Sequence, residues 1–309
     1  MTAVFLVGVG ILLLYLGGEL LVRNASLLAR ALGLSPLVVG LTIVAFGTSA
    51  PELAASLAAA LRGAPELAFG NVVGSNAANL GLILALAALI RPIRAQARFL
   101  RRELPFMVGV VGLLLLVAMD GRVSRLEGSL LLVLLSFYLY VLLRDREVPE
   151  VEAEFAAEYG GSAGLVVLRF ILLALGVLTL ALGSSTLIEG AVALARYFGV
   201  GERAIGLTVV AVGTSLPELA AALVAALRRE GDILLGNLVG SNIFNVLAIL
   251  GIVAAVRPLA IAAGLGSDLL GMAGISLLAW AFLWTGMRLG RREAAVLLAF
   301  YLLYVGAVF

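Results

Sequence analysis

Gly-Thr-Ser-Ala-Pro-Glu-Leu occupies residues 47–53, and Gly-Thr-Ser-Leu-Pro-Glu-Leu occupies residues 213–219. Each stretch lies inside a run of residues that is otherwise apolar enough to cross a membrane. A carboxylate, two hydroxyls and a proline are all costly in a hydrocarbon environment. Their occurrence twice in the same order indicates a function within the membrane.

A second pair of motifs follows at the same distance. Residues 70–79 read Gly-Asn-Val-Val-Gly-Ser-Asn-Ala-Ala-Asn, and residues 236–245 read Gly-Asn-Leu-Val-Gly-Ser-Asn-Ile-Phe-Asn. Both pairs align without a gap at 166 positions, the distance from Glu52 to Glu218. The chain therefore contains an internal duplication. A duplication kept only for packing is the alternative, but the matched residues are the polar ones, which favours a shared site.

The composition is that of a polytopic membrane protein. Of 309 residues, 63% are hydrophobic and 13% are charged, against about 25% charged in soluble domains. The chain has no cysteine, which excludes disulfides and thiolate metal sites, and no histidine, the commonest transition-metal ligand. The first apolar run has neither a basic start nor a cleavage site, which predicts a spanning helix rather than a signal peptide. Nothing in the charge pattern indicates nucleic-acid binding.

The fold class expected is an all-α membrane protein with ten transmembrane helices, arranged as two inverted five-helix repeats. A spanning helix needs about 20 apolar residues. That length predicts spans at 3–30, 36–61, 67–90, 104–119, 127–143, 165–195, 203–227, 233–255, 266–285 and 293–308. The predicted division is a first repeat at 1–143, an acidic cytoplasmic linker at 144–164 and a second repeat at 165–309. Five spans per repeat would insert the second copy upside down, with a site at the midplane between the halves.

The arginines in the loops predict the orientation. Thirteen would lie on one side of the membrane and six on the other. The thirteen are Arg30, Arg91, Arg94, Arg98, Arg101, Arg102, Arg144, Arg146, Arg228, Arg229, Arg288, Arg291 and Arg292. The six are Arg62, Arg122, Arg125, Arg196, Arg203 and Arg257. Because basic loops stay in the cytoplasm, we expect an inner-membrane protein with both termini outside.

Glu52 and Glu218 are the first candidate ligands. A mid-membrane carboxylate costs at least ~2.5 kcal/mol on insertion scales and is a functional candidate by default. The hydroxyls of Thr48, Ser49, Thr214 and Ser215 lie about one turn before the two acids. Proline kinks a helix, so carbonyls near Ala45 and Ala211 could turn away from the helix axis.

The second motifs add neutral oxygens. Ser75 and Asn79 are four residues apart, as are Ser241 and Asn245, so each pair shares one helix face. Hard oxygen ligands in such number suit Ca²⁺ or Na⁺. The alternative for each single Ser or Asn is an interhelical hydrogen bond.

The four motifs together resemble the two alpha repeats of the cation/calcium exchanger superfamily, and within it the sodium/calcium exchangers. The resemblance covers essentially the whole chain. It implies ion binding by the glutamates, the hydroxyls beside them, nearby carbonyls and the second motifs. The residues that match are Glu52, Glu218, Thr48, Ser49, Thr214, Ser215, Ala45, Ala211, Ser75, Asn79, Ser241 and Asn245.

One position departs from part of the superfamily. Some relatives, including potassium-dependent exchangers, have an aspartate where this chain has Asn245, which puts potassium dependence in doubt. Glu19 and Glu189 are not repeat mates and rank lower. They are interpreted as interfacial or as paired with a nearby arginine such as Arg23.

The function predicted is secondary antiport of Ca²⁺ against Na⁺ by alternating access, with the ions as transported substrates, the lipid bilayer as surroundings and no cofactor or obligate protein partner. Calcium/proton antiport is the first alternative, because the two glutamates could also carry protons. An intramembrane hydrolase is disfavoured, since there is no histidine base, and the chain is not expected to be an enzyme. A channel is disfavoured because the ligands come from two inverted halves.

Overall fold

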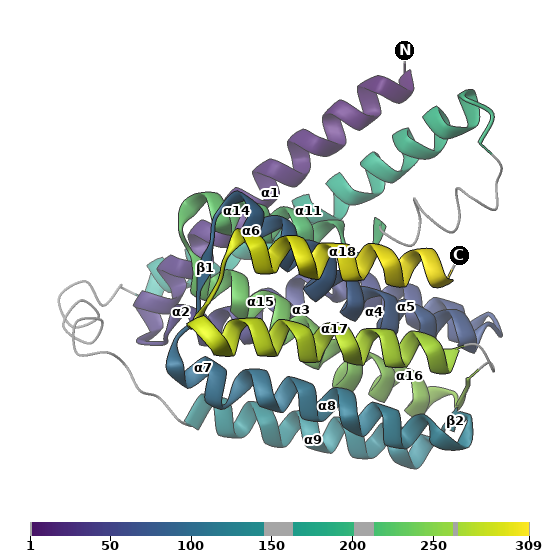
Figure 1. The fold of residues 1–309 in the computed structure, drawn as a ribbon. Helices are drawn as coiled ribbons and strands as arrows, with labels where there is room; N and C mark the ends of the chain where they lie inside the picture. Colours follow the sequence, from purple (N-terminus) through teal and green to yellow (C-terminus); the bar gives the residue numbers. More distant parts are fainter. Residues whose placement is uncertain (1, 145–162, 201–212, 262–264, 309) are drawn as a thin grey trace.

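The computed structural model describes residues 2–144, 163–200, 213–261 and 265–308 (Figure 1). Seven of its helices are long and apolar enough to cross a membrane, and a bent helix pair brings the number to eight. This confirms an all-α polytopic membrane protein. The predicted linker lies largely outside the described residues, as does the first part of the span expected at 203–227.

The elements of the first half are, in order, α1 (Thr2–Leu32), α2 (Pro36–Val39), η1 (Gly40–Val44), α3 (Ala45–Thr48), α4 (Ala50–Leu61), α5 (Pro65–Ala78), η2 (Asn79–Leu84), α6 (Ala85–Ile90), β1 (Ile93–Arg94), α7 (Ala97–Arg101), α8 (Glu103–Val117), η3 (Ala118–Asp120), β2 (Arg122–Val123) and α9 (Arg125–Arg144). Those of the second half are α11 (Ala163–Tyr197), α14 (Leu216–Arg228), α15 (Gly231–Phe244), η5 (Asn245–Leu250), α16 (Gly251–Val256), β3 (Leu259–Ala260), α17 (Leu265–Gly286), β4 (Arg288–Leu289) and α18 (Arg291–Val308).

The described elements recur at the spacing of the sequence repeat. Helix α15 starts and ends 166 positions after α5, and the π-helical segment η5 does so after η2. The short strands pair across the two halves, β1 with β4 and β2 with β3, both antiparallel. Each two-stranded sheet thus takes one strand from each half, so the duplicated units are joined at both ends of the bundle.

Helices α5 and α15 lie at the centre of the molecule. Every residue of α15 from Ile233 to Phe244 is buried, and the main apolar cluster packs α5 and α15 against α8, α9, α17 and α18. Between Ile233 and Phe244 the polar side chains of α15 are therefore those of the second motif, Asn237, Ser241 and Asn242. A central position for both second motifs follows.

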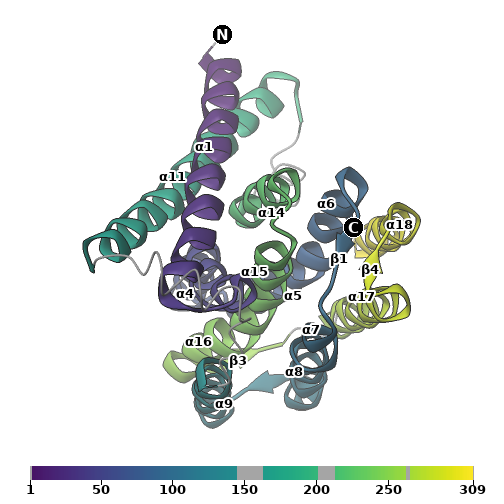
Figure 2. The ribbon, with the colours of Figure 1, turned by 90° about the vertical axis from the view of Figure 1, so that its left-hand side faces the viewer.

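Helices α1 and α11 cross each other on one side of this bundle (Figure 2). Glycines on both helices allow the contact: a Cβ at Gly17 would lie 2.7 Å from the backbone nitrogen of Leu180, and one at Gly183 would lie 2.8 Å from that of Leu14. A second, smaller apolar cluster holds this pair against α2 and η1. Most buried apolar residues of the pair therefore belong to this second cluster, and Val22 of α1 joins the main one.

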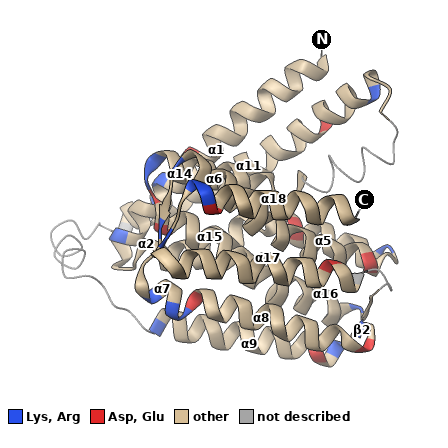
Figure 3. Cartoon of the chain, viewed as in Figure 1, with Lys and Arg blue, Asp and Glu red and all other residues tan. Residues whose placement is uncertain are grey.

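The charged residues gather at the two ends of the bundle (Figure 3). The arginines of β1, β4 and the start of α18 lie at one end, and those of β2 and the start of α9 lie at the other. The sequence-based division of these loop arginines into two groups is thus reproduced in space. Which end faces the cytoplasm stays a prediction.

Candidate cation site

The two glutamates lie in the first turns of short helices, each of which begins directly after a serine N-cap. Glu52 follows the start of α4 and Glu218 follows the start of α14, and each side chain is 1% exposed. Proline fits the first turn of a helix because its missing N–H has no partner there. Pro51 accordingly restarts the helix, and the axis bends by 44° between α3 and α4. The expected kink is confirmed, as a 44° bend centred on Ser49.

Hydrogen bonds connect each carboxylate to the other half of the molecule. Ser49 Oγ donates to Glu218 Oε1 over 3.3 Å, and Ser215 Oγ donates to Glu52 Oε1 over the same distance. The second oxygen of each carboxylate, Oε2, is buried and has no hydrogen-bond partner among the described residues. One oxygen per glutamate is therefore held by a hydroxyl while the other has no protein donor.

The asparagines of the second motifs repeat this arrangement. Asn79 Nδ2 donates to Asn242 Oδ1, and Asn245 Nδ2 donates to Asn76 Oδ1, both over 3.0 Å. Asn76 and Asn242 also donate to each other's backbone carbonyl, at 3.2 Å in both directions. The Oδ1 atoms of Asn79 and Asn245 are buried without a donor in the described part of the chain.

The remaining hydroxyls join the first motifs to the second. Ser215 Oγ also lies within hydrogen-bond distance of Ser75 Oγ, at 3.2 Å, which brings Ser75 next to the Glu52 carboxylate. Thr48 Oγ1 donates to Asn237 Oδ1 over 3.0 Å and lies 3.5 Å from Ser241 Oγ. The structure thus gathers these predicted side chains in one buried cluster at the crossing of the two halves.

Thr214 differs from its counterpart Thr48. Its Oγ1 donates to Asn71 Oδ1 over 3.3 Å, but the residue is only partly buried. Asn71 Nδ2 donates in turn to Ser56 Oγ over 2.9 Å. The matched Asn237 Nδ2 is buried without an acceptor, because Ala222 stands at the position that corresponds to Ser56.

The carbonyl of Ala45 is not freed by the break. It accepts the backbone N–H of Ser49 over 3.0 Å, and Thr48 Oγ1 lies 3.4 Å from it. The expectation that it turns away from the helix is therefore wrong for this conformation. Proline at position 51 removes a bond to residue 47, so the ladder through Ala45 stays intact. Ala211 lies outside the described residues.

Sequence reasoning missed four asparagines. Asn71, Asn76, Asn237 and Asn242 all hydrogen-bond within the cluster. Side chains four residues apart share one helix face. That criterion selected only Ser75 with Asn79 and Ser241 with Asn245. Identity between the two copies was the signal that could have found them, because all four are identical in the repeat.

The two lower-ranked acids lie outside this cluster. Glu19 on α1 accepts from Arg228 Nε over 2.7 Å, at the end of α14. Glu19 is thus paired with an arginine, as expected, but with Arg228 of α14 rather than with Arg23, because the contact runs between helices. Glu189 is exposed on α11.

Four unpartnered buried oxygens can be satisfied together by a cation. A buried acceptor without a donor costs about 1–3 kcal/mol, and more when it is charged. Coordination of a metal ion would remove that cost, and four such atoms are available: Glu52 Oε2, Glu218 Oε2, Asn79 Oδ1 and Asn245 Oδ1. Among the described residues no group of three or more acidic, histidine or cysteine side chains gathers in one place. The negative charge of the cluster therefore comes from two carboxylates.

These features define an integral membrane protein in which matched halves of one chain build a buried, oxygen-lined site suited to a hard cation. The chain matches the family described as sodium/calcium exchanger protein over residues 2–144 and 168–309. It belongs to this family, within the cation/calcium exchanger superfamily. Exchangers move ions without changing covalent bonds, so membership confirms that the chain is not an enzyme.

Several curated proteins are similar along most of the chain. The inner membrane protein YrbG of Escherichia coli is 40% identical over 256 residues, covering 81% of this chain and 78% of its own. The putative antiporter CaxA of Alkalimonas amylolytica is 38% identical, covering 94% and 92%. The sodium/calcium exchanger MaX1 of Methanosarcina acetivorans is 34% identical, covering 97% and 96%.

Solved structures share the fold over the full length. The sodium-calcium exchanger NCX_Mj soaked with 10 mM Na⁺ and zero Ca²⁺ superimposes with a TM-score of 0.88 at 29% identity, covering 100% of this chain and 99% of that one. The fold shared with these solved exchanger structures therefore agrees with the family to which the sequence belongs.

Proposed function

We propose that this protein is a secondary active antiporter that exchanges Ca²⁺ for Na⁺ at the cluster between Glu52 and Glu218. The observation that supports this most directly is the set of four buried oxygens without a donor, two from each half at matched positions. Two carboxylates neutralise one Ca²⁺. The neutral amide and hydroxyl oxygens beside them suit Na⁺ equally well, because both ions prefer hard oxygen ligands.

Alternating access is the proposed mechanism, with ten spanning helices in two inverted halves. The reciprocal bonds between Asn76 and Asn242 support it, because neither half completes the cluster by itself. In transporters with inverted repeats, the site at the repeat interface opens to each side in turn. The ions are the transported substrates in this proposal, not resident cofactors.

The names of similar proteins support sodium as the coupling ion. MaX1 is described as a sodium/calcium exchanger, and NCX_Mj has been soaked with combinations of Na⁺, Ca²⁺ and Sr²⁺. Both are similar over nearly their whole length. Calcium/proton antiport is the alternative that the test must separate.

The test is calcium uptake into proteoliposomes that contain the purified full chain. Radioactive calcium is supplied outside while an outward gradient of Na⁺, K⁺ or H⁺ is imposed separately, with the membrane potential clamped. We expect the sodium gradient alone to drive uptake. Uptake that follows the pH gradient and ignores sodium would replace the proposal with calcium/proton antiport, and uptake under none of the gradients would remove both.

A further inference from the structure

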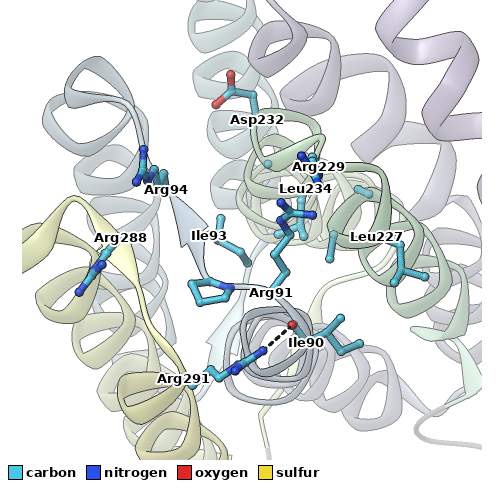
Figure 4. A pocket seen from close by; sticks show the side chains of 14 residues that line it. Ile90, Arg91, Ile93, Arg94, Leu227, Arg229, Asp232, Leu234, Arg288 and Arg291 are labelled. Atoms are coloured by element: carbon cyan, nitrogen blue, oxygen red, sulfur yellow. Dashed lines mark hydrogen bonds between the residues drawn. The ribbon is translucent and has the colours of Figure 1, made fainter.

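A cavity of about 880 Å³ lies at the arginine-rich end of the bundle, away from the cation site. It is enclosed by the segment that joins α6 to β1, by the junction of α14 with α15, and by β4 with the start of α18 (Figure 4). Five arginines line it: Arg91, Arg94, Arg229, Arg288 and Arg291. Among the described residues that line it, Asp232 is the only acidic one, and its Oδ2 already accepts from Gln96 over 2.7 Å.

The guanidinium groups of this pocket are largely without partners. Arg291 donates to the carbonyls of Leu89 and Ile90 and so closes the end of α6. The guanidinium groups of the other four arginines have no acceptor among the described residues. Figure 4 shows Arg91 and Arg229 extending into the same hollow from different elements. Like charges held around one cavity repel each other, and an anion between them relieves that repulsion.

The duplicated fold supplies an internal comparison. The opposite end of the bundle is built from the corresponding elements, β2 with β3 and the junction of α4 with α5. At that end Ala260 corresponds to Arg94, and Gly63 corresponds to Arg229. Gly63 and Arg229 both have a left-handed backbone, with φ of 84° and 66°. This conformation is strained for any residue other than glycine. Arg229 therefore adopts a strained backbone at a position where its repeat mate, Gly63, is unstrained.

A third position points the same way. Arg122 corresponds to Arg288, but Arg122 Nε is paired with Asp120 Oδ2 at 3.1 Å. Gly286 stands where that aspartate would lie in the second half. At this position, therefore, the pocket keeps the arginine and loses the acid that neutralises it. A general excess of arginine on one side of a membrane accounts for their number, but not for the approach of Arg91 and Arg229 to each other in one hollow (Figure 4).

We propose that this pocket binds a phosphate group. Arginine forks match phosphate oxygens in geometry and charge, and basic pockets between transmembrane helices bind the headgroups of acidic lipids. Leu227 and Ile90, 61% and 46% exposed, line the same cavity. An apolar lining beside the arginines suits an acyl chain and favours the headgroup of an acidic phospholipid as the source of the phosphate.

The experiment compares three forms of the full chain. One carries Arg91→Gln, Arg94→Gln and Arg229→Gln in the pocket. The control carries Arg30→Gln, Arg101→Gln and Arg292→Gln, which remove the same charge from exposed positions that do not line the cavity. The third is the unmodified protein. Helix content and elution volume show whether each variant has folded, and binding is read without any transport assay.

Two ligand sources are tested separately. Each protein is exchanged into phosphatidylcholine nanodiscs with and without phosphatidylglycerol, and bound phosphatidylglycerol is counted by native mass spectrometry. In a second arm, thermal unfolding in detergent is followed with sodium phosphate or with sodium chloride at equal ionic strength. We expect the unmodified protein and the control to retain phosphatidylglycerol. The folded pocket variant should retain at least ~10-fold less phosphatidylglycerol than the unmodified protein.

Stabilisation by free phosphate without lipid retention would support the phosphate site and overturn the lipid source. Equal losses in the pocket variant and the control would overturn the proposal, because general attraction between charges would then explain the binding. Absence of both lipid retention and phosphate stabilisation in the unmodified protein would overturn it as well. If the pocket variant does not fold, Arg94→Gln alone, an exposed strand residue at the cavity edge, replaces it under the same criteria.

Discussion

Glu52 and Glu218 carry the charge of the candidate cation site, and each depends on the other half of the chain for its hydroxyl donor. The sequence predicted both residues, because a carboxylate that recurs inside an apolar span of each half is costly unless it binds an ion. It could not predict the crossed pairing, since Ser49 precedes Glu52 by three residues yet donates to Glu218. Local spacing indicates which residues share a helix face but not which helix lies opposite.

The first prediction is that Glu52→Gln and Glu218→Gln each abolish calcium transport without unfolding the protein. Either change removes one of two charges opposite Ca²⁺ and keeps the size of the side chain. We expect calcium affinity to fall ~100-fold or more, equivalent to ~2.8 kcal/mol. Calcium binding to the purified protein measures this, with Glu66→Gln, an exposed acid at the start of α5, as the matched control. Near-normal binding by either site variant would remove that glutamate from the site.

The second prediction concerns Asn245, whose Oδ1 has no donor while its Nδ2 donates to Asn76. Asn245→Asp adds a third carboxylate and places an acceptor opposite the oxygen of Asn76. Protons should then compete with calcium more strongly, so transport by the variant should fall more steeply on acidification. By resemblance to the potassium-dependent relatives, we also expect some response to potassium. Initial calcium flux at fixed sodium gradient is compared across pH for both proteins; superimposable profiles would place Asn245 outside the ion path.

At the scale of elements, the break at Ser49 was predictable from Pro51, but the π-helical segments were not. η2 begins at Asn79 and η5 begins at Asn245, where each helix widens by one residue per turn. Such segments are frequent at functional sites. Both begin at an asparagine that hydrogen-bonds to the other half, and hydrophobic periodicity along a single helix does not reveal contacts of that kind.

The third prediction tests a close backbone contact between elements of the two halves. A Cβ at Gly236 of α15 would lie 2.6 Å from the carbonyl oxygen of Leu37 and 3.0 Å from the Cα of Gly40. Neither backbone atom can move away alone, so Gly236→Ala should destabilise the protein by about 1–3 kcal/mol. Because α15 carries Asn237 and leads directly into Asn245 of η5, calcium transport should fall with it.

Thermal unfolding and calcium flux measure the two effects together. Gly109→Ala in α8 is the matched control, since a Cβ there meets no atom within 4 Å and alanine is favoured in helices. We expect the control to keep its unfolding temperature or to raise it slightly. An unfolding temperature for Gly236→Ala equal to that of the control would show that the glycine contact is looser than these distances indicate.

For the whole molecule, the repeat in the sequence predicted a single site between two halves, and the fold arranges the described residues in that way. Only the structure reveals that strands of the two halves also pair at both ends of the bundle, β1 with β4 and β2 with β3. Two-residue strands carry no periodic signal, so they were missed. The boundaries proposed for the two repeats remain predictions, and so does the orientation in the membrane.

The last prediction tests that orientation with single cysteines, which the natural chain lacks entirely. Arg101 lies at the arginine-rich end and Arg122 lies at the other, and both are exposed. Basic loops are retained in the cytoplasm, so the end with thirteen loop arginines should face inward. In intact cells, a membrane-impermeant maleimide should therefore label Arg122→Cys and not Arg101→Cys. After permeabilisation both should react, and the unmodified chain gives the background.

Labelling of Arg101→Cys alone in intact cells would reverse the orientation and put both termini in the cytoplasm. Equal labelling of both would mean that the chain inserts in two orientations, and the arginine difference would then be too small to decide between them.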